Sequence, residues 1–436
     1  MKQRLRIAIV LTRELNVAGG RPAVLRNVIA ALAQDHDLEI IRLRNVFALR
    51  SAIAFAGVFV AWIASIMRLR PLPLQCMLYA GPREVSAVCT RIAKRQFDAV
   101  YLDTIRCHML LRAIRTGLRN VHVVTDFDDL MSRRMSLIHD QNLPLLTGNV
   151  AASAPSWLKR VLSGPAARFI SWYEAAALRH SESDATVLSD AVVLVSRHER
   201  DELRRQLPIA LHARIHCIPP MMPLRSSPGS SPSHRRFVFI GSDRLLQNRA
   251  AIDCLIRIWR RLCPSTVLHI FGDQSRPIQP ADAVVWHGAV PDLSEVYRPG
   301  SILLLPAPFG GGCKTKVAEA WSFGCPVLGN PAAFEGFDFA GYPLNLPENS
   351  WDEYISHPEA FDSIWQEAAQ AGRDLVAENL SPHRFASAWE RIIRPQARWP
   401  APKELASTAA AQLAFNGPAP APAAATERRI GGILAE

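Results

Sequence analysis

The residues best suited to chemistry follow a short apolar run that ends at Pro306. A glycine triplet at 310–312 is followed by Lys314 and Lys316 at the start of a predicted helix, and Glu319 lies one turn further along. A glycine turn that opens onto a helix N-terminus presents free backbone N–H groups and the positive end of the helix dipole to an anion. The pattern therefore indicates a diphosphate site, with the Glu319 carboxylate placed to accept hydrogen bonds from ribose hydroxyls.

The same stretch allows a simpler interpretation, in which the loop and its lysines are solvated and Glu319 only caps a helix. It does not match a Walker A loop, because Pro308 and Cys313 stand where that motif needs glycine. Spacing alone leaves the diphosphate site and the simpler interpretation open.

A second cluster, Asp126, Asp128 and Asp129, comes just beyond a predicted buried strand. One interpretation is an Asp-x-Asp motif that holds Mg²⁺ or Mn²⁺ against a diphosphate. Another, implied by the family resemblance given below, is a group of acids beside a cleft that holds the hydroxyls of a donor or acceptor. A third is helix capping by Asp126 or Asp128, with Arg133 and Arg134 as charge partners. We favour the hydroxyl-binding role.

Residues 51–67 carry no charge and lie between Arg50 and Arg68. A membrane-spanning helix needs ~20 apolar residues, with ~17 as the lower limit, and a span here would place one sheet on both sides of a bilayer. A helix that is apolar all round is usually buried. The other interpretation is an exposed or half-exposed helix that docks in the membrane interface or receives a lipid tail, which the flanking arginines favour.

The net charge of +11 is concentrated in the first half of the chain. Residues 1–217 hold 30 Lys and Arg against 18 Asp and Glu, whereas the rest is close to neutral. This asymmetry predicts an anionic partner for the first half, either a lipid surface or a pyrophosphate, unless the arginines are simply solvated. No standard nucleic-acid motif occurs in the basic stretch, so we expect no nucleic-acid partner.

Short apolar runs with the length of buried parallel strands alternate with helical patterns along the chain. They lie at 6–11, 38–43, 99–102, 121–125 and 191–196 in the first half, and at 236–242, 267–272, 283–288, 301–306 and 326–330 in the second. The chain is therefore predicted to be α/β, with two Rossmann-like domains whose parallel sheets face each other across a cleft. Ligands bind at the carboxyl ends of the strands in such sheets.

Composition suggests where these domains begin and end. A Pro- and Ser-rich linker at 218–234 separates an N-terminal domain at 1–217 from a C-terminal domain at 235–380. A helix with one apolar face is predicted within 381–398, and an Ala- and Pro-rich disordered tail at 399–436. The eight cysteines show neither a CxxC pair nor zinc-ligand spacing, which indicates free thiols and a cytoplasmic protein.

The run from Pro306 to Val327 reads P-x-x-x-G-x-G-x-K-x-K-V-x-E-A-x-x-x-G-x-P-V. It resembles the nucleotide-sugar site of GT-B glycosyltransferases, especially the retaining family 4 (glycosyl transferases group 1) of bacterial surface and exopolysaccharide biosynthesis. Three further segments match that family in order: FVFIGSDRLLQNR, VVWHGAVPDLSEVY and SPHRFASAWERII. The resemblance implies an acceptor domain followed by a nucleotide-sugar domain, and a C-terminal helix that crosses back to the first domain.

The resemblance also implies roles by position. Glu319 would hold the ribose, and Lys316 and Arg244 would neutralise the diphosphate, acting as catalytic residues together with Asp126 and Asp128. The other residues of the implied nucleotide-sugar site are Gly19, Gly20, Gly241, Gly288, Val290, Gly310, Gly311, Gly312 and Lys314.

Two positions depart from the family pattern. Family members commonly carry a glutamate where this chain has Gly311, and that glutamate contacts the hydroxyls of the donor sugar. They also often carry a lysine a few residues beyond the phosphate-loop arginine, where Arg249 is the nearest basic residue here. The identity and orientation of the donor sugar therefore stay open.

The implied function is transfer of a sugar from a nucleotide-diphosphate sugar to a glycan acceptor, lipid-linked through polyprenyl pyrophosphate, with retention at the anomeric carbon. The transfer would need no cofactor and no metal ion. It would take place in the cytoplasm, with peripheral contact to the anionic inner face of the membrane. Two alternatives are a nucleotide-sugar epimerase and a non-catalytic GT-B-like protein of a polysaccharide assembly complex.

Overall fold

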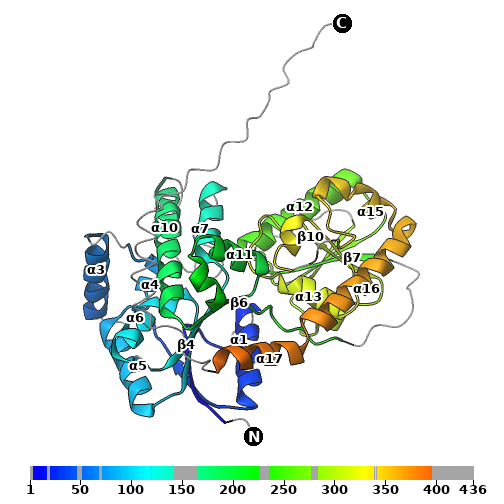
Figure 1. Ribbon diagram of the computed structural model, residues 1–436. Helices are drawn as coiled ribbons and strands as arrows, with labels where there is room; N and C mark the ends of the chain where they lie inside the picture. Colours follow the sequence, from blue (N-terminus) through cyan, green and yellow to red (C-terminus); the bar gives the residue numbers. More distant parts are fainter. Residues whose placement is uncertain are drawn as a thin grey trace. The chain divides into compact units, whose positions relative to one another are not determined.

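The computed structural model describes residues 3–16, 20–46, 52–67, 71–118, 120–141, 165–225, 235–275, 283–337, 339 and 341–394. In this part of the chain, helices alternate with parallel strands that form two sheets (Figure 1). The predicted tail, Gly19 and residues 226–234 of the predicted linker lie outside the described residues.

The first sheet has six strands in the order β2-β1-β3-β4-β5-β6, and all neighbours are parallel. The strands are β1 (Arg6–Leu11), β2 (Asp37–Arg42), β3 (Ala99–Asp103), β4 (His122–Asp128), β5 (Ala191–Leu194) and β6 (Ile215–Cys217). The chain runs from β1 to one edge and then returns to build the other side from β3. The strand order therefore reverses between β1 and β3, the place where such sheets bind ligands.

The second sheet has five parallel strands in the order β11-β10-β7-β8-β9. They are β7 (Arg236–Ile240), β8 (Leu268–Phe271), β9 (Val284–Gly288), β10 (Ser301–Leu305) and β11 (Val327–Gly329). Here the order reverses between β7 and β10. The glycine loop follows β10, so it starts at the carboxyl end of a strand at this reversal point.

The helices cover the sheets. In the first half they are α1 (Gly20–Ala33), α3 (Ala52–Met67), α4 (Leu74–Met77), α5 (Pro82–Arg95), η1 (Ile105–Cys107), α6 (His108–Gly117), α7 (Met131–Asp140), α10 (Pro165–Leu188), α11 (Arg197–Arg205) and η2 (Ile209–Arg214). In the second half they are α12 (Leu246–Leu262), η3 (Leu293–Glu295), α13 (Thr315–Ser322), α14 (Pro331–Phe334), η4 (Glu348–Ser350), α15 (Asp352–Ser356), η5 (Pro358–Phe361), α16 (Asp362–Asn379) and α17 (Pro382–Ile393).

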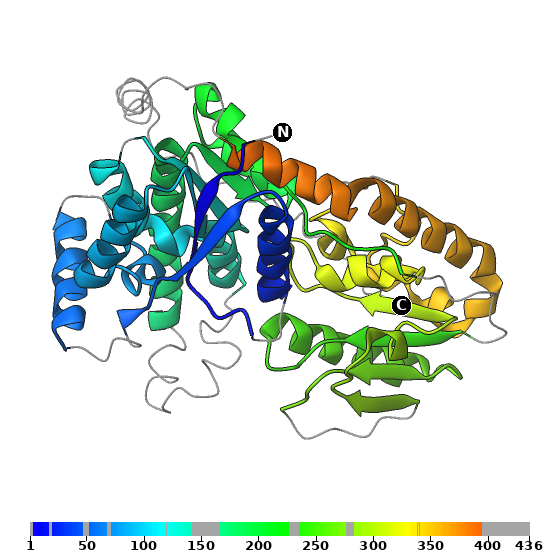
Figure 2. The same ribbon diagram turned by 90° about the horizontal axis from the view of Figure 1, so that it is seen from below.

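The terminal helix α17 packs against the first sheet and not the second. Its apolar face, Phe385, Trp389, Ile392 and Ile393, belongs to the core that also contains residues of β1 and α1. The Trp389 ring lies 5.5 Å from the ring of Tyr101 on β3. Figures 1 and 2 show α17, in orange, beside α1 and the strands of the first sheet. This confirms the predicted crossover.

All ten predicted apolar runs are strands, with ends that differ by up to three residues. The largest difference is in β4, which continues to Asp128, so Asp126 and Asp128 lie in the strand and not just beyond it. The extension follows from the burial of Phe127 and from pairing with β3 and β5. The sequence analysis missed β6, because its three residues include His216 and form no apolar run.

Residues 52–67 form the single helix α3, which is only half buried. Val58 packs into a small core, whereas Phe59, Val60, Ile63, Ile66 and Met67 are exposed. The fully buried reading of this stretch is therefore wrong. No helix in the described part of the chain is long and apolar enough to cross a membrane.

Candidate active site

A cavity of about 380 Å³ lies between the two sheets and is lined by residues that follow strands of both. From the first half come Arg13 after β1 and Thr104 after β3, and from the second half come the glycine loop and the start of α13. A more open hollow of about 730 Å³ lies near the amino ends of β1, β3 and β4. Because ligands of parallel sheets bind at the carboxyl ends, the smaller cavity is the candidate site.

The wall from the second half carries two lysines that make no ion pair. Lys314 Nζ donates to the carbonyl oxygen of Gly311 at 2.7 Å, and Lys316 Nζ donates to Asn248 Oδ1 at 2.8 Å. Burial lowers the pKa of Lys316 to about 8, although the Glu319 carboxylate opposes that shift. Burial also lowers the pKa of Lys314. Two partly desolvated ammonium groups beside a helix N-terminus form a site for a diphosphate.

The glycine loop adopts a backbone conformation that other residues rarely take. Gly311 has φ +97° and Gly312 has φ +58°, in the region that favours glycine. A Cβ atom at Gly312 would lie 3.8 Å from the Cβ of Asp129, so the loop also approaches the first half closely. Both features bring backbone of the second half to the cavity wall.

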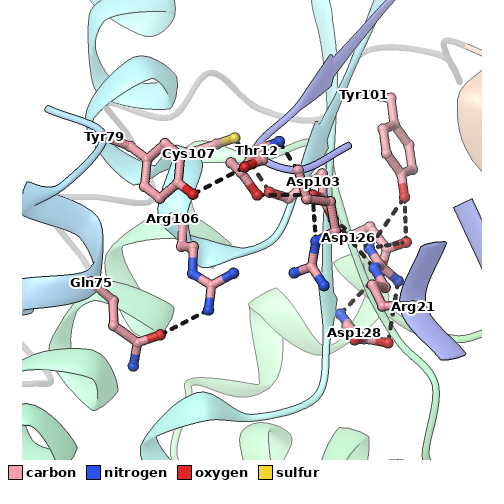
Figure 3. A network of polar contacts seen from close by, with 11 residues as sticks. Thr12, Arg21, Gln75, Tyr79, Tyr101, Asp103, Arg106, Cys107, Asp126 and Asp128 are labelled. Atoms are coloured by element: carbon pink, nitrogen blue, oxygen red, sulfur yellow. Dashed lines mark hydrogen bonds and ion pairs between the residues drawn. The ribbon is translucent and has the colours of Figure 1, made fainter. Parts of the chain in front are cut away.

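The wall from the first half is built around Arg21, which is buried on α1 (Figure 3). Its guanidinium contacts three carboxylates: Asp103 at 3.0 Å, Asp126 at 3.0 Å and Asp128 at 3.2 Å. Burial by itself would lower the pKa of Arg21, but Asp126 and Asp128 outweigh it and raise that pKa. The Tyr101 hydroxyl donates to Asp126 at 2.5 Å. The network holds together the ends of β3 and β4 and the start of α1.

Arg21 and Asp128 are the members of this network that line the cavity, and Asp128 is its one carboxylate there. The backbone of Asp128 has φ +68°, an uncommon conformation for a residue with a side chain. Burial raises the pKa of Asp128 to about 6, against the lowering effect of Arg21. Strained backbone of this kind persists where the surrounding structure holds it in place, and it is enriched at functional sites.

The capping interpretation of the aspartate cluster is wrong. The residue before α7 is Leu130, and no side chain caps that helix. Asp126 and Asp128 pair with Arg21, and Arg134 pairs with Asp129, while Arg133 pairs with acidic residues of α11 and of the segment after α14. The aspartates therefore serve the cavity wall and not a helix end.

Several residues of the predicted site line the cavity, and others lie around it. Those in the wall are Gly20, Asp128, Gly311, Gly312, Lys314 and Lys316. Those outside the wall are Asp126, Gly241, Arg244, Gly288, Val290, Gly310 and Glu319. Arg244 is half exposed and pairs with Asp273 at 2.8 Å. Glu319 lies partly buried next to Lys316, and burial raises its pKa.

The sequence analysis missed a buried glutamate beside the glycine loop. Glu199, at the start of α11, accepts a hydrogen bond from the Leu130 N–H at 3.3 Å, and its Oε2 has no partner among the described residues. Burial, together with the charge of Asp129, raises the pKa of Glu199 to about 8. A Cβ atom at Gly311 would lie 3.6 Å from its Oε1. A carboxyl group therefore stands next to the position where the family pattern has a glutamate.

The signal for Glu199 was present in the sequence. Ser196-x-x-Glu199 after a buried strand is a capping-box pattern, and the Ser196 hydroxyl does accept from the Glu199 N–H. The glutamate carboxylate of such a box usually turns back to the cap residue, whereas here it binds the backbone of a neighbouring segment. Further residues of the wall that the sequence did not predict, among them Arg13, Arg21, Thr104, Arg106 and Asn248, carry no motif.

Among the described residues, no group of three or more His, Cys, Asp or Glu side chains is arranged to hold a metal ion. The predicted independence of metal stays a prediction.

The segment that forms the second-half wall of the cavity matches a known protein family. Residues 234–338, which include the glycine loop, Lys314, Lys316 and Glu319, match the family model described as glycosyl transferases group 1. Residues 234–338 therefore form a glycosyl transferases group 1 domain, and the chain as a whole has the GT-B fold. No curated protein sequence matches it.

Solved structures share the fold of this glycosyltransferase over most of its length. Sucrose-phosphate synthase from Thermosynechococcus elongatus is 15% identical, with a TM-score of 0.61 over 90% of this chain and 98% of that one. Anabaena HepE in complex with UDP and glucose is 10% identical, with a TM-score of 0.57 over 89% and 99%. The lipopolysaccharide outer core galactosyltransferase WaaB is 12% identical, with a TM-score of 0.56 over 89% and 99%.

Proposed function

We propose that this glycosyltransferase uses a nucleotide-diphosphate sugar as donor and places the diphosphate on the two lysines of the cavity. The observation that carries the proposal is an imbalance of charge. Lys314 and Lys316 line the cavity, and no carboxylate of the described residues lies within ion-pair distance of either ammonium group. Burying cations without partners is costly, so such a wall suits an anionic ligand. HepE, a structural neighbour, was solved with UDP and glucose.

The nucleotide end of the donor is assigned to the second half. We expect Glu319 to accept from the ribose hydroxyls once the donor is bound, since it lies on α13 one turn beyond Lys316. We expect Asp128, which lines the cavity and has a raised pKa, to accept a hydrogen bond from a hydroxyl of the donor sugar. Glu199 stands beside Gly311 and would support the donor sugar from behind the glycine loop.

The proposed reaction is a substitution at the anomeric carbon of the donor sugar. The bond from that carbon to the diphosphate oxygen breaks, and a bond to an acceptor hydroxyl oxygen forms on the same face. The hydroxyl proton passes to the leaving phosphate oxygen. Lys316 and the N-terminus of α13 stabilise the charge that develops on the diphosphate, which is a role that a metal ion would otherwise fill.

The acceptor is proposed to be a lipid-linked glycan of bacterial polysaccharide synthesis. The support is an exposed apolar surface on α3 and α10, made of Phe59, Ile63, Phe169 and Trp172, which are between 45% and 64% exposed. Such a surface, on the half of the chain that is rich in Arg and Lys, suits an anionic membrane interface. WaaB, another structural neighbour, is a lipopolysaccharide galactosyltransferase.

Thermal stabilisation by a panel of nucleotide sugars tests the donor proposal. A donor at ~100 times its dissociation constant adds ~2.7 kcal/mol of stability, which raises the melting temperature measurably. Lys316→Gln should remove the response, whereas the matched variant Arg261→Gln, on the exposed face of α12, should keep it. Failure of every nucleotide and nucleotide sugar to stabilise the wild type would refute the proposal.

Two outcomes of that screen would favour the alternatives. Conversion of the free donor without an acceptor would identify an epimerase. Nucleotide binding without transfer to any glycan acceptor would favour a non-catalytic binding protein. The glycine at position 311, where the family pattern has a glutamate, is the reason to test this alternative.

A further inference from the structure

The cation Arg106 stands on the wall of the first half and takes no part in the proposed donor site. Its Nη2 donates to Gln75 Oε1 at 3.2 Å, so its hydrogen-bond partner among the described residues is a neutral amide. No carboxylate of the described residues lies within ion-pair distance of it. Figure 3 shows Arg106 well apart from the group formed by Arg21 and Asp128. The Glu174 carboxylate acts on Arg106 only from beyond ion-pair distance, so the guanidinium can still bind an anion in the cavity.

The side chain that holds Arg106 is itself fixed in place. Gln75 lies on α4, and the Glu174 carboxylate of α10 accepts from the backbone N–H groups of Leu74 and Gln75 at 2.7 and 3.1 Å. Tyr79, just after α4, donates its hydroxyl to the Thr12 carbonyl at 3.0 Å. These contacts connect three elements of the first half around Arg106. The guanidinium is therefore preorganised, which lowers the entropy cost of binding a ligand.

Thr104 lines the same wall and has two unusual features. Its backbone has φ +68°, which is rare for a β-branched residue, and its N–H donates to the Asp126 carbonyl at 2.8 Å. The residue is 5% exposed, and its hydroxyl has no hydrogen-bond partner among the described residues. A buried hydroxyl without a partner costs free energy that a ligand could recover.

We propose that Arg106 and Thr104, assisted by Arg13, form a subsite for a phosphate group carried by the acceptor. Phosphate suits this set because it accepts bidentate hydrogen bonds from a guanidinium and a further bond from a hydroxyl. Arg13 lines the cavity as well, and it is already paired with Asp103 at 3.3 Å, so its role is secondary. The inference rests on the proposed function, because it takes the lysine wall to be occupied by the donor.

The phosphate can come from two sources, a lipid diphosphate or a soluble sugar phosphate. The contacts between the apolar surface on α3 and α10 and the segment before α4 support the lipid diphosphate. The Tyr173 hydroxyl of α10 accepts from Trp62 Nε1 at 2.8 Å and donates to the Leu72 carbonyl at 2.9 Å, which joins α3 to the segment before α4. Because Gln75 on α4 follows this segment and holds Arg106, the apolar surface and the phosphate subsite are connected through neighbouring contacts, which favours a lipid diphosphate.

The experiment measures binding of anionic probes to protein saturated with UDP. Farnesyl pyrophosphate represents the lipid source and glucose 6-phosphate the soluble source, and farnesol and glucose are their uncharged controls. UDP affinity is measured first for each protein. The variants are Arg106→Gln, Arg106→Lys and Thr104→Val, the last of which keeps the β-branched shape. The matched control is Arg112→Gln, an exposed arginine on α6 that does not line the cavity.

We expect one or both anionic probes to bind the wild type, and their uncharged controls to bind much more weakly. Arg106→Gln should weaken the anionic probe by about ten- to a hundredfold, and Thr104→Val by severalfold, because hydrogen bonds to charged groups are lost. The probe affinity of Arg106→Lys should lie between those of Arg106→Gln and Thr104→Val, and that of Arg112→Gln should match the wild type. UDP affinity and melting temperature should stay constant in all variants.

The two proposals fail in different ways. If UDP binds normally but Arg106→Gln and Arg112→Gln bind the anionic probe equally, the phosphate subsite is refuted and the donor site stands. The phosphate subsite is also refuted, and the donor site stands, if neither anionic probe binds to wild-type protein that is saturated with UDP. If UDP itself does not bind, both the proposed donor site and the phosphate subsite that depends on it are refuted.

Discussion

Replacement of Arg21 by methionine tests the buried network of the first half most directly. The side chain of Arg21 is 6% exposed and contacts Asp103, Asp126 and Asp128, so the substitution would leave three carboxylates with less compensation. Breaking a buried ion pair by removing one partner costs about 3–5 kcal/mol. We expect Arg21→Met to lower the free energy of unfolding by about 3 kcal/mol at pH 7.5, toward the lower end of that range.

The lower end is expected because the aspartates keep other partners. Asp103 still accepts from the Thr12 hydroxyl at 2.9 Å, and Asp126 still accepts from the Tyr101 hydroxyl. Asp128 loses most, but its pKa is already raised to about 6, so without Arg21 it would be protonated near neutral pH. Proton uptake at that site removes part of the uncompensated charge.

The pH dependence gives a second measurement with a defined sign. A carboxyl group whose pKa is higher in the folded than in the unfolded protein destabilises the fold as pH rises through that interval. Because Arg21 opposes the raised pKa of Asp128, its loss raises that pKa further, and the gap in stability between wild type and Arg21→Met should widen from pH 5 to pH 8. Urea unfolding at several pH values measures this gap, and Arg21→Met combined with Asp128→Asn should recover part of it.

One outcome would refute this reasoning. If Arg21→Met unfolds at the wild-type urea midpoint across the pH range, the contacts of Arg21 contribute little, and the network does not hold the ends of β3 and β4. The matched control is Arg26→Met, an exposed arginine further along α1 that has no carboxylate partner among the described residues. Its midpoint should hardly change.

Four further predictions concern activity and localisation. Donor affinity should fall as pH rises through about 8, where Lys316 loses its proton in the free enzyme, and a pH profile of the dissociation constant that stays flat in Lys316→Gln checks this. Glu319→Ala should lower donor use by two to three orders of magnitude with little change in melting temperature, and near-normal transfer would contradict the ribose role. Transfer should persist in EDTA, whereas activity that needs added Mn²⁺ would assign the aspartates as metal ligands. Phe59→Ser with Ile63→Ser should release the protein from anionic vesicles in a flotation assay, and unchanged binding would exclude that surface.

Local patterns in the sequence predicted most of the fold. Runs such as residues 6–11 and 301–306 are rich in Val, Ile and Leu, and each forms a strand buried on both faces. The glycine loop was predictable for the same reason, because the glycines that its backbone conformation requires are adjacent in the chain. The ends of strands such as β4 were less so, because pairing with neighbours decides where a strand stops.

The parts of the site that depend on distant residues could not be predicted. Arg21 and Asp103 are 82 residues apart, and nothing around either suggests that they meet. In the sequence, Arg21 is one of many arginines in a basic half of the chain, and arginines in such a stretch are expected at the surface. Thr104 and Arg106 likewise look ordinary until the backbone conformation and the absence of charge partners are visible.

The packing of α17 on the first sheet determines when the first half can be completed during synthesis. Trp389, which is 1% exposed, fills the core beside Tyr101, and Ile393 is fully buried in the same core. The ribosome makes these residues after the whole second half, so strands β1 to β6 emerge long before the helix that covers them. An exposed apolar face on nascent chains is a surface that chaperones bind and that promotes aggregation. Any attempt to produce the first half alone should therefore carry residues 382–394 as a separate peptide or a fused segment.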